Sequence, residues 1–413
     1  MEEARIYDSG EKFICRCHNI NTIILGISEI SVPVMVRYTL LKAEKGRCTM
    51  NSKQDRVVYL DAMRIIAIFL VIFNHLKGYS LYQISSGPKQ WIYMFITMVT
   101  RFNVPLFLMI SGTLLLDKEV SYGNLLGKRI KRFASVIVLF EFGLYIEYYL
   151  AALIKGDKSA NFSLFKFIQG VFAGSLEGAR SYWYLYAYMG MLLTLPFLQK
   201  IAKQMDKKDF ILLIAIHFFV YSFLPIINIV MKAVGVVGGF RLSGDLSMPL
   251  ATTKAFFYPL IGYYLDRHVD VTAFGKKRVI QLIFIAFAGI LISSICTYYE
   301  GETMGGYTQN YVQLFDYVTT MVVFLVIKYF FVVGWKNIHN NIARAIAYAG
   351  SLTFGIYLLD PYLKKIVYSR FENSLEPILP TIVVSFLWCM VSMLVGGSIT
   401  AILKKIPYVR QLL

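Results

Sequence analysis

The feature that most constrains this chain is the recurrence of apolar runs long enough to cross a membrane. Hydrophobic residues make up 57% of its 413 residues, and charged residues only 16%. A run of about 20 apolar residues spans a bilayer as a helix, because lipid cannot satisfy an open backbone. The sequence therefore predicts an all-α integral membrane protein, a polytopic bundle of about ten transmembrane helices. We place them at 57–77, 91–116, 133–154, 181–200, 210–231, 249–265, 279–299, 309–333, 345–363 and 380–403.

The basic residues are distributed unevenly over the connections between these spans. Ten spans put both termini on one side, and the connections on that side are richer in lysine and arginine by about two to one. This pattern predicts cytoplasmic termini in a multi-pass protein of the cell (inner) membrane. It also accounts for the net charge of +17 without a nucleic-acid partner, because basic residues near the lipid bilayer are attracted to anionic headgroups. The basic stretches are 118–132, 200–208, 267–278, 336–344 and 404–410.

Residues 1–50 differ in character from the remainder of the chain. They mix polar and apolar residues, contain no uninterrupted apolar run of spanning length, and lack the features of a signal peptide. Met50 directly precedes a short polar stretch, residues 51–56, and then the first span, so we expect a non-essential extension or a mis-set start, followed by a transmembrane domain over residues 51–413. The cysteines have no ligand spacing, so we predict neither a disulfide framework nor a metal site.

The first span carries two costly residues on one face. Intervals of three or four residues separate Asp61, Arg64, Ile68, Val71 and His75 in turn. These five residues therefore share one side of a helix. Arg64 and His75 are eleven residues apart, which is about 16 Å of rise. Ionisable residues inside a span usually face a polar pathway or a site. The alternative is that Arg64 snorkels to one interface while His75 lies in the opposite headgroup zone.

Two further basic features allow both a functional and a structural interpretation. Arg101 lies deep in the second span, before Pro105 and a Ser111-Gly112 pair that permits close helix packing. It either lines a substrate cavity or neutralises an acid in a kinked packing helix. Arg129 and Arg132 are three residues apart and form a fork suited to phosphate oxygens. A basic cluster at a cytoplasmic helix start is also what membrane topology alone produces.

The remaining candidates lie in later spans. Glu141 and Glu147 could orient a histidine or pair with Arg101, and His217 reads as a packing histidine. The aromatic run that contains Trp183 is typical of an interfacial belt or of a sugar-stacking platform. Asp360, which precedes Pro361, is expected near the outer face that also holds His75.

His75 is the best candidate for a reactive group. The imidazole of histidine exchanges protons near neutral pH, so neutral His75 could take the proton of an acceptor hydroxyl that attacks an acyl carbonyl. Arg64 or Arg101 could hold an anionic group or the developing oxyanion. No nucleotide-binding loop, zinc-protease motif or Ser/His/Asp order is present in the sequence.

Taken in order, these motifs resemble acyltransferase family 3, the membrane-bound O-acyltransferases that modify bacterial surface polysaccharides. The resemblance covers the chain from the first predicted span to the last and leaves the N-terminal 50 residues outside. It rests on Tyr59-Leu-Asp61-Ala-Met-Arg64 with His75, on Val104-Pro105-Leu-Phe-Leu-Met-Ile-Ser111-Gly112, on the Arg129 and Arg132 pair, on Tyr182-Trp183-Tyr184-Leu185 with Pro196, and on Ser351, Gly355-Ile-Tyr357-Leu-Leu.

The resemblance implies an acyl-CoA donor, usually acetyl-CoA, and a glycan or lipid-linked sugar hydroxyl as acceptor. It implies that His75 and Arg64 are essential, and it maps the arginine pair of the family onto Arg129 and Arg132. The family often ends its Tyr-Leu-Leu motif in histidine, whereas this chain has Asp360. The role of that histidine is therefore open here. No extracellular hydrolase domain follows the last predicted span, so the chain resembles the stand-alone transmembrane members of the family.

We therefore predict a membrane O-acyltransferase that transfers an acyl group, acetyl in the first instance, from acyl-CoA to a sugar hydroxyl of a surface or lipid-linked polysaccharide. His75 and Arg64 are the catalytic candidates, and no tightly bound cofactor is expected. Arg129 and Arg132 would bind the CoA phosphates, and the substrate-binding candidates are Arg101, Trp183 and Tyr357. A transporter of polysaccharide or lipid-linked sugar would use many spans and buried charge equally well. A scaffold of a glycan-synthesis complex would fit only if His75 and Arg64 were dispensable.

Overall fold

The computed structural model divides the chain into two units, Met1–Arg56 and Val57–Leu413. It describes residues 57–413 apart from 157–161, 177, 237, 305 and 308–310. In the first unit it describes only two short antiparallel strands, β1 (Tyr7–Asp8) and β2 (Glu11–Lys12). The predicted extension over residues 1–50 otherwise lies outside the described residues.

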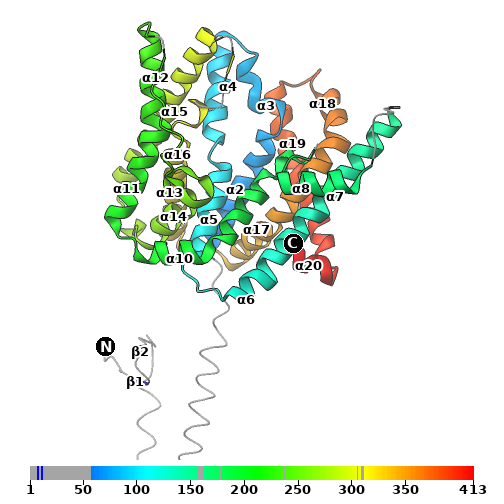
Figure 1. The fold of residues 1–413 in the computed structure, drawn as a ribbon, viewed down its shortest axis with the longest axis horizontal. Helices are drawn as coiled ribbons and strands as arrows, with labels where there is room; N and C mark the ends of the chain where they lie inside the picture. The colour runs from blue at the N-terminus through cyan, green and yellow to red at the C-terminus, as the bar shows by residue number, and fades with distance from the viewer. Residues whose placement is uncertain are drawn as a thin grey trace, which may run out of the picture. The chain divides into compact units, whose positions relative to one another are not determined.

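The second unit is helical throughout its described part (Figure 1). Several helices continue into one another through π-helical or 3-10 turns, denoted η. The elements are α2 (Val58–Asn74), α3 (Lys77–Ser80), η2 (Leu81–Gln83), α4 (Gly87–Thr100), α5 (Asn103–Leu115), α6 (Tyr122–Asn124), η3 (Leu125–Ile130), α7 (Lys131–Ile154), α8 (Leu164–Ala173), η4 (Arg180–Tyr182), α9 (Trp183–Leu193), α10 (Leu195–Gln204), α11 (Lys207–Phe218), η5 (Phe219–Phe223), α12 (Leu224–Ala233), α13 (Pro249–Thr252), α14 (Lys254–Arg267), η6 (Val271–Ala273), α15 (Lys276–Met304), η7 (Tyr311–Gln313), α16 (Asp316–Tyr329), η8 (Phe330–Gly334), α17 (Asn340–Leu363), η9 (Lys364–Tyr368), α18 (Ser369–Leu375), α19 (Thr381–Leu403) and α20 (Pro407–Leu412).

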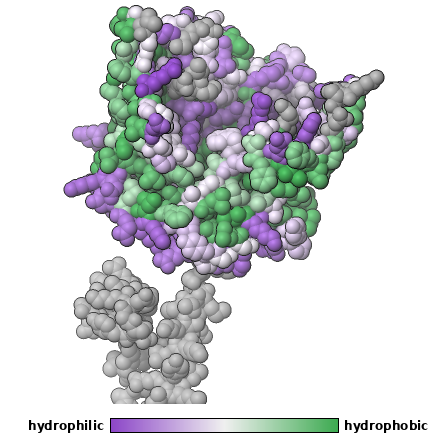
Figure 2. All heavy atoms as spheres, in the orientation of Figure 1, coloured by the Kyte–Doolittle hydropathy of each residue, from purple (hydrophilic) through white to green (hydrophobic). Residues whose placement is uncertain are grey.

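Seven of the described helices are long and apolar enough to cross a membrane, and an eighth span results if the bent pair α2 and α3 counts as one. The predicted helical membrane fold is confirmed, with seven to eight candidate spans in place of about ten. Figure 2 shows apolar residues along both flanks of this unit and hydrophilic residues at its lower edge and in its upper centre.

Two predicted spans, 181–200 and 249–265, consist of shorter helices. The first divides into α9 and α10 at Thr194, just before Pro196. The second is carried mainly by α14, whose 14 residues rise only about 21 Å, against about 30 Å of hydrocarbon. Apolarity in α14 reflects burial inside the bundle, since Leu260 and Ile261 are fully enclosed.

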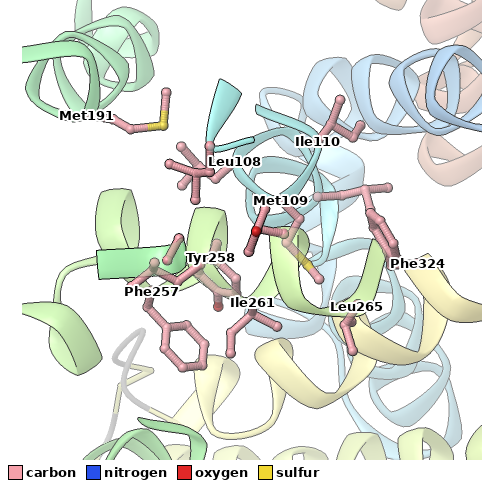
Figure 3. Close-up of a cluster of buried hydrophobic side chains, with 14 of the residues drawn as sticks. Leu108, Met109, Ile110, Met191, Phe257, Tyr258, Ile261, Leu265 and Phe324 are labelled. Atoms are coloured by element: carbon pink, nitrogen blue, oxygen red, sulfur yellow. The ribbon is translucent and has the colours of Figure 1, made fainter. Parts of the chain in front are cut away.

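A close crossing of α5 and α14 forms the centre of the bundle. A Cβ atom on Gly112 would lie 1.9 Å from the Pro259 carbonyl oxygen, and one on Gly262 would lie 2.2 Å from the Met109 carbonyl oxygen. The backbones therefore touch directly, which only glycine permits. Thr113 Oγ1 donates a hydrogen bond to the Gly262 carbonyl oxygen at 3.1 Å. Figure 3 shows apolar side chains around this crossing; those labelled come mainly from α5 and α14, with Met191 of α9 and Phe324 of α16.

A second close contact joins α2 to α17. A Cβ atom on Gly350 would lie 2.6 Å from the Asp61 Cβ atom, so glycine lets the two helices approach. Gly355, one turn further along α17, faces Thr400 of α19 in the same way, 2.3 Å from its Cγ2 atom. The glycines of the predicted 350–357 motif thus hold α17 between α2 and α19.

Polar contacts fix the end of the bundle at which α2 begins. The Tyr59 hydroxyl donates a hydrogen bond to Asp266 near the end of α14. The neighbouring Arg267 pairs with Asp117, just beyond α5, at 3.0 Å. We call this the Asp266 end. His75 lies 16 residues beyond Tyr59, which is about 24 Å along the helix axis.

The glycine crossing predicts a selective loss of stability in Gly262→Ala. The new methyl group would meet a backbone oxygen that cannot move away, and such overpacking costs about 1–3 kcal/mol. Gly190→Ala is the matched control, because a Cβ atom at that helical position meets nothing within 4 Å. We expect it to be neutral or up to about 1 kcal/mol more stable. Unfolding of the purified protein in detergent measures both changes, and equal stability of the two variants would contradict the packing account.

Candidate active site

The chain bends by 74° between α2 and α3, and His75 lies at that bend. The predicted span 57–77 is therefore a helix that ends at Asn74. A break inside the membrane leaves backbone groups that need other partners. Lys364 of η9 supplies one, because its ammonium group donates a hydrogen bond to the His75 carbonyl oxygen. The bend is thus held in place by a cation from a distant helix.

His75 forms a close pair with Asp360 of α17. The His75 Nδ1 atom lies 2.7 Å from Asp360 Oδ2, and the Asp360 side chain is only 2% exposed. Ser392 of α19 donates a longer hydrogen bond, 3.5 Å, to the other carboxylate oxygen. The two members of the pair are 285 residues apart in the sequence, so only the packing of α2 on α17 brings them together.

This geometry assigns different roles to the two ring nitrogens of His75. A carboxylate oxygen only accepts hydrogen bonds, so Nδ1 carries the proton of the neutral ring. The Nε2 atom then keeps its lone pair and can accept a proton from a substrate hydroxyl. Asp360 fixes the orientation of the ring, and its carboxylate would stabilise an imidazolium at this position. The pair therefore has the arrangement of a general base with an orienting acid.

Arg64 lies on α2 three turns before His75. Its Nη1 atom donates a hydrogen bond to Asp61 Oδ1 at 2.7 Å, and Asp61 is buried against Gly350. The Arg64 side chain is 27% exposed, which leaves several of its N–H donors open to a further acceptor. Arg64 and His75 thus occupy one helix face at two depths, as the spacing predicts.

A line of aromatic rings runs between these two depths. Tyr357 lies one turn before Asp360 and contacts the Tyr184 ring edge-on, with 5.9 Å between centroids. Tyr184 in turn lies 6.0 Å from Tyr188. Arg64 interacts electrostatically with both Tyr184 and Tyr188. The aromatic run that begins at Trp183 therefore contributes Tyr184 and Tyr188 to the interior, one helical turn apart.

The predicted arginine pair lies at the far end of this line. Arg129 and Arg132 both interact electrostatically with the Tyr188 hydroxyl, as Arg64 does. The Arg129 Nη1 atom is buried and has no hydrogen-bond partner among the described residues. Arg129 belongs to the π-helical turn η3, and such turns are frequent at functional sites. Arg132 instead donates from Nε and Nη2 to the Leu412 carbonyl oxygen, at 3.3 and 3.2 Å.

Three other predicted residues form no hydrogen bond with His75 or Asp360 in the described part of the chain. Arg101 donates a hydrogen bond to the Tyr79 hydroxyl of α3. Trp183 is 48% exposed at the start of α9. The Tyr357 ring is buried, and its hydroxyl donates to the Ser181 carbonyl oxygen at 2.6 Å. Tyr357 therefore packs beside the site and has its hydroxyl already engaged.

The alternatives considered for the acids and for His217 are also resolved. Glu141 accepts hydrogen bonds from the Tyr186 hydroxyl, and Glu147 pairs with Lys365, so among the described residues neither bonds to a histidine or to Arg101. His217 is a packing residue. Its Nδ1 atom lies 2.6 Å from the Ala251 carbonyl oxygen, and its ring stacks on Phe257 at 3.8 Å.

Lys364 and Ser392 are site residues that sequence reasoning missed. Lys364 follows Asp360 by four residues, which is the spacing of one helix face, and that signal was available. Ser392 lies among apolar residues of the last span with no distinguishing pattern. Asp360 was placed correctly near His75, but nothing in the sequence indicated a direct bond between them.

Together, the fold and the site define an integral membrane protein with a half-buried histidine bonded to a buried carboxylate, and a group of arginines at another depth of the same bundle. A family model described as an acyltransferase domain matches residues 57–401. The chain therefore belongs to acyltransferase family 3 and is a membrane-bound acyltransferase. No curated protein and no solved structure matches it at a significant level. Family membership favours the acyltransferase prediction over the transporter alternative.

The histidine–carboxylate bond predicts a large effect of Asp360→Asn on acyl transfer. The amide cannot stabilise the imidazolium and can turn its NH₂ group toward Nδ1, which favours the wrong tautomer. Losses of about 10²- to 10⁴-fold in kcat are usual when a general base or its orienting acid is impaired. Asp245→Asn, at an exposed loop position, is the matched control and should keep full activity. An Asp360→Asn enzyme with unchanged kcat would show that the bond is only structural.

Proposed function

We propose that this acyltransferase moves an acyl group, acetyl in the first instance, from CoA to a sugar hydroxyl of a surface or lipid-linked polysaccharide at the cell membrane. The observation that carries the proposal is the bond of His75 to Asp360, set three helical turns from Arg64 on one face of α2. His75 as the base and Arg64 as the cationic anchor lie at different depths, which suits a donor and an acceptor that enter from opposite sides of the membrane.

The donor end of this scheme is the group formed by Arg64, Arg129 and Arg132. CoA carries phosphates, and a guanidinium group matches phosphate oxygens with paired N–H donors. The buried Nη1 atom of Arg129 has no hydrogen-bond partner among the described residues, so a phosphate oxygen would satisfy it. Arg132, already bonded to the Leu412 carbonyl oxygen, would contribute its charge and its remaining N–H donors. The pantetheine arm would then follow Tyr188 and Tyr184 toward His75.

The acyl transfer itself needs one base and one site of charge stabilisation. The Nε2 atom of His75 takes the proton of the sugar hydroxyl, while the oxygen attacks the thioester carbonyl carbon. The carbon–sulfur bond breaks as the ester carbon–oxygen bond forms, and the imidazolium returns its proton to the CoA thiolate. Asp360 stabilises the imidazolium in the interval. Arg64 lies about 16 Å of rise before His75, too far for a hydrogen bond to the reacting carbonyl, so it would act by positioning the donor.

The orientation in the membrane follows from the same scheme. CoA is a cytoplasmic metabolite, so the Asp266 end with the arginine group would face the cytoplasm, together with both termini. The bend at His75 would then lie toward the outer side, where the polysaccharide acceptor is presented. The uneven distribution of lysine and arginine supports this orientation.

Labelled acetyl-CoA tests the proposed reaction. Membranes that contain the wild-type protein should transfer label into a glycan or lipid-linked sugar fraction, and His75→Ala membranes should not, because the base is lost. His339→Ala is the control, since that histidine is exposed at the start of α17. Protein amounts are compared by immunoblot. Wild-type membranes that leave the glycan fraction unlabelled, or an active His75→Ala variant, would contradict the proposal.

A second test concerns the donor end. Arg129→Gln should raise the KM for acetyl-CoA by about 10-fold or more, because removing a charged hydrogen bond costs about 1.5–3 kcal/mol. Little change in kcat is expected, since the phosphates bind equally in the ground and transition states. The neighbouring Lys128→Gln, at an exposed position, is the matched control for loss of one positive charge. If both substitutions raise the KM equally, Arg129 contributes only to membrane topology and does not bind the donor.

A further inference from the structure

A second polar cluster lies inside the bundle, apart from the His75–Asp360 pair. Arg101 stands between α4 and α5, Lys254 is the first residue of α14, and Asp316 is the first residue of α16. All three belong to apolar helices or to the break between two of them. Ionisable groups at such depth are costly and usually serve a function. We call these three residues the Lys254 cluster.

Hydrogen bonds between α14 and the start of α16 fix the geometry of this cluster. Lys254 Nζ donates to Gln313 Oε1 at 2.7 Å, and the Tyr258 hydroxyl donates to Asp316 Oδ1 at 3.1 Å. Lys254 and Tyr258 are four residues apart on α14, while Gln313 and Asp316 are three apart, so the two bonds lie side by side. The ammonium group and the carboxylate are therefore neighbours.

Two cations share the single carboxylate of this cluster. The electrostatic partners of Asp316 are Lys254 and Arg101, and Lys254 in turn interacts with Asp316 and Arg101. Among the ion pairs of the described residues, none joins Asp316 to either cation. The two cations also keep N–H donors beyond their bonds to Gln313 and Tyr79. The cluster thus has an excess positive charge and free donors, which together suit an anion.

The cluster lies beside the proposed catalytic histidine. Thr100, which precedes Arg101, donates a hydrogen bond of 3.4 Å to Asn74, which precedes His75. Arg101 itself bonds the hydroxyl of Tyr79, four residues after His75. The depths also agree. Lys254 lies 12 residues before Asp266, about 18 Å of rise, and Arg101 lies 16 residues before Asp117, about 24 Å, while His75 lies about 24 Å from the same end.

We propose that Arg101 and Lys254 bind an anionic group of the acceptor, a carboxylate or a phosphate, and hold its hydroxyl toward His75. This rests on the proposed function in that the bound molecule is the acceptor of the acyl group. The substrate class is then an acidic sugar or a sugar linked to a lipid diphosphate, and not a neutral glycan. Asp316 limits the affinity, since its charge competes with the bound anion for the same two cations.

Equilibrium binding to the purified full chain in detergent tests the proposal without acyl-CoA. The probes are methyl glucuronide for the carboxylate, farnesyl diphosphate for the lipid phosphate, and methyl glucoside as the neutral reference. We expect one anionic probe to bind at least 10-fold more tightly than methyl glucoside. Lys254→Gln should weaken that binding at least 10-fold, whereas Lys254→Arg, which keeps the charge, should retain it.

Asp316→Asn should change the affinity for the anionic probe in the opposite direction. Loss of its charge should tighten binding of the same anionic probe several-fold, a gain that a merely damaged protein would not show. Absence of anion preference in the wild type, unchanged binding in Lys254→Gln, or weaker binding in Asp316→Asn would each overturn the proposal. Because the readout is binding, failure of acetyl transfer from CoA would refute the proposed reaction and leave this result intact.

Discussion

The packing of α2 against α17 is the contact on which the site depends. At one level Gly350 lets α17 approach the Asp61 side chain, which in turn accepts a hydrogen bond from Arg64. At another level the same two helices bring His75 to Asp360. A wider residue at position 350 would separate the helices and lengthen both contacts. One glycine-mediated contact therefore sets the geometry of both the predicted cationic anchor and the predicted base.

The membrane explains why the charges of the bundle occur in groups. An isolated charge in hydrocarbon is unstable, so each buried ionisable group needs a partner of opposite charge or several hydrogen bonds. Arg64 has Asp61, His75 has Asp360, and Lys364 has the carbonyl freed by the bend after α2. The Lys254 cluster and the Arg129 Nη1 atom are less completely satisfied by the protein, and both are where we propose that a ligand binds.

Much of the fold could be predicted from the sequence, because lipid leaves a long apolar run few options besides a helix. The errors in predicting the fold from the sequence also have physical causes. The predicted number of spans exceeded that of the structure at two places. Residues 181–200 divide into α9 and α10 at Thr194, and α14 is apolar because it is buried among other helices, which hydropathy cannot distinguish from burial in lipid. The shared face of Arg64 and His75 followed from helix periodicity alone. The Asp360 bond and the Lys254 cluster could not be predicted, because each depends on which distant helices become neighbours.

The central claim is that one face of α2 connects the donor to the acceptor. The most direct test is a cryo-EM structure of the protein with a ketone analogue of acetyl-CoA that cannot transfer its acyl group. We expect the diphosphate against Arg129, the pantetheine arm along Tyr188 and Tyr184, and the ketone carbon beside His75 Nε2. An analogue whose diphosphate binds elsewhere, or whose ketone lies away from His75, would contradict it.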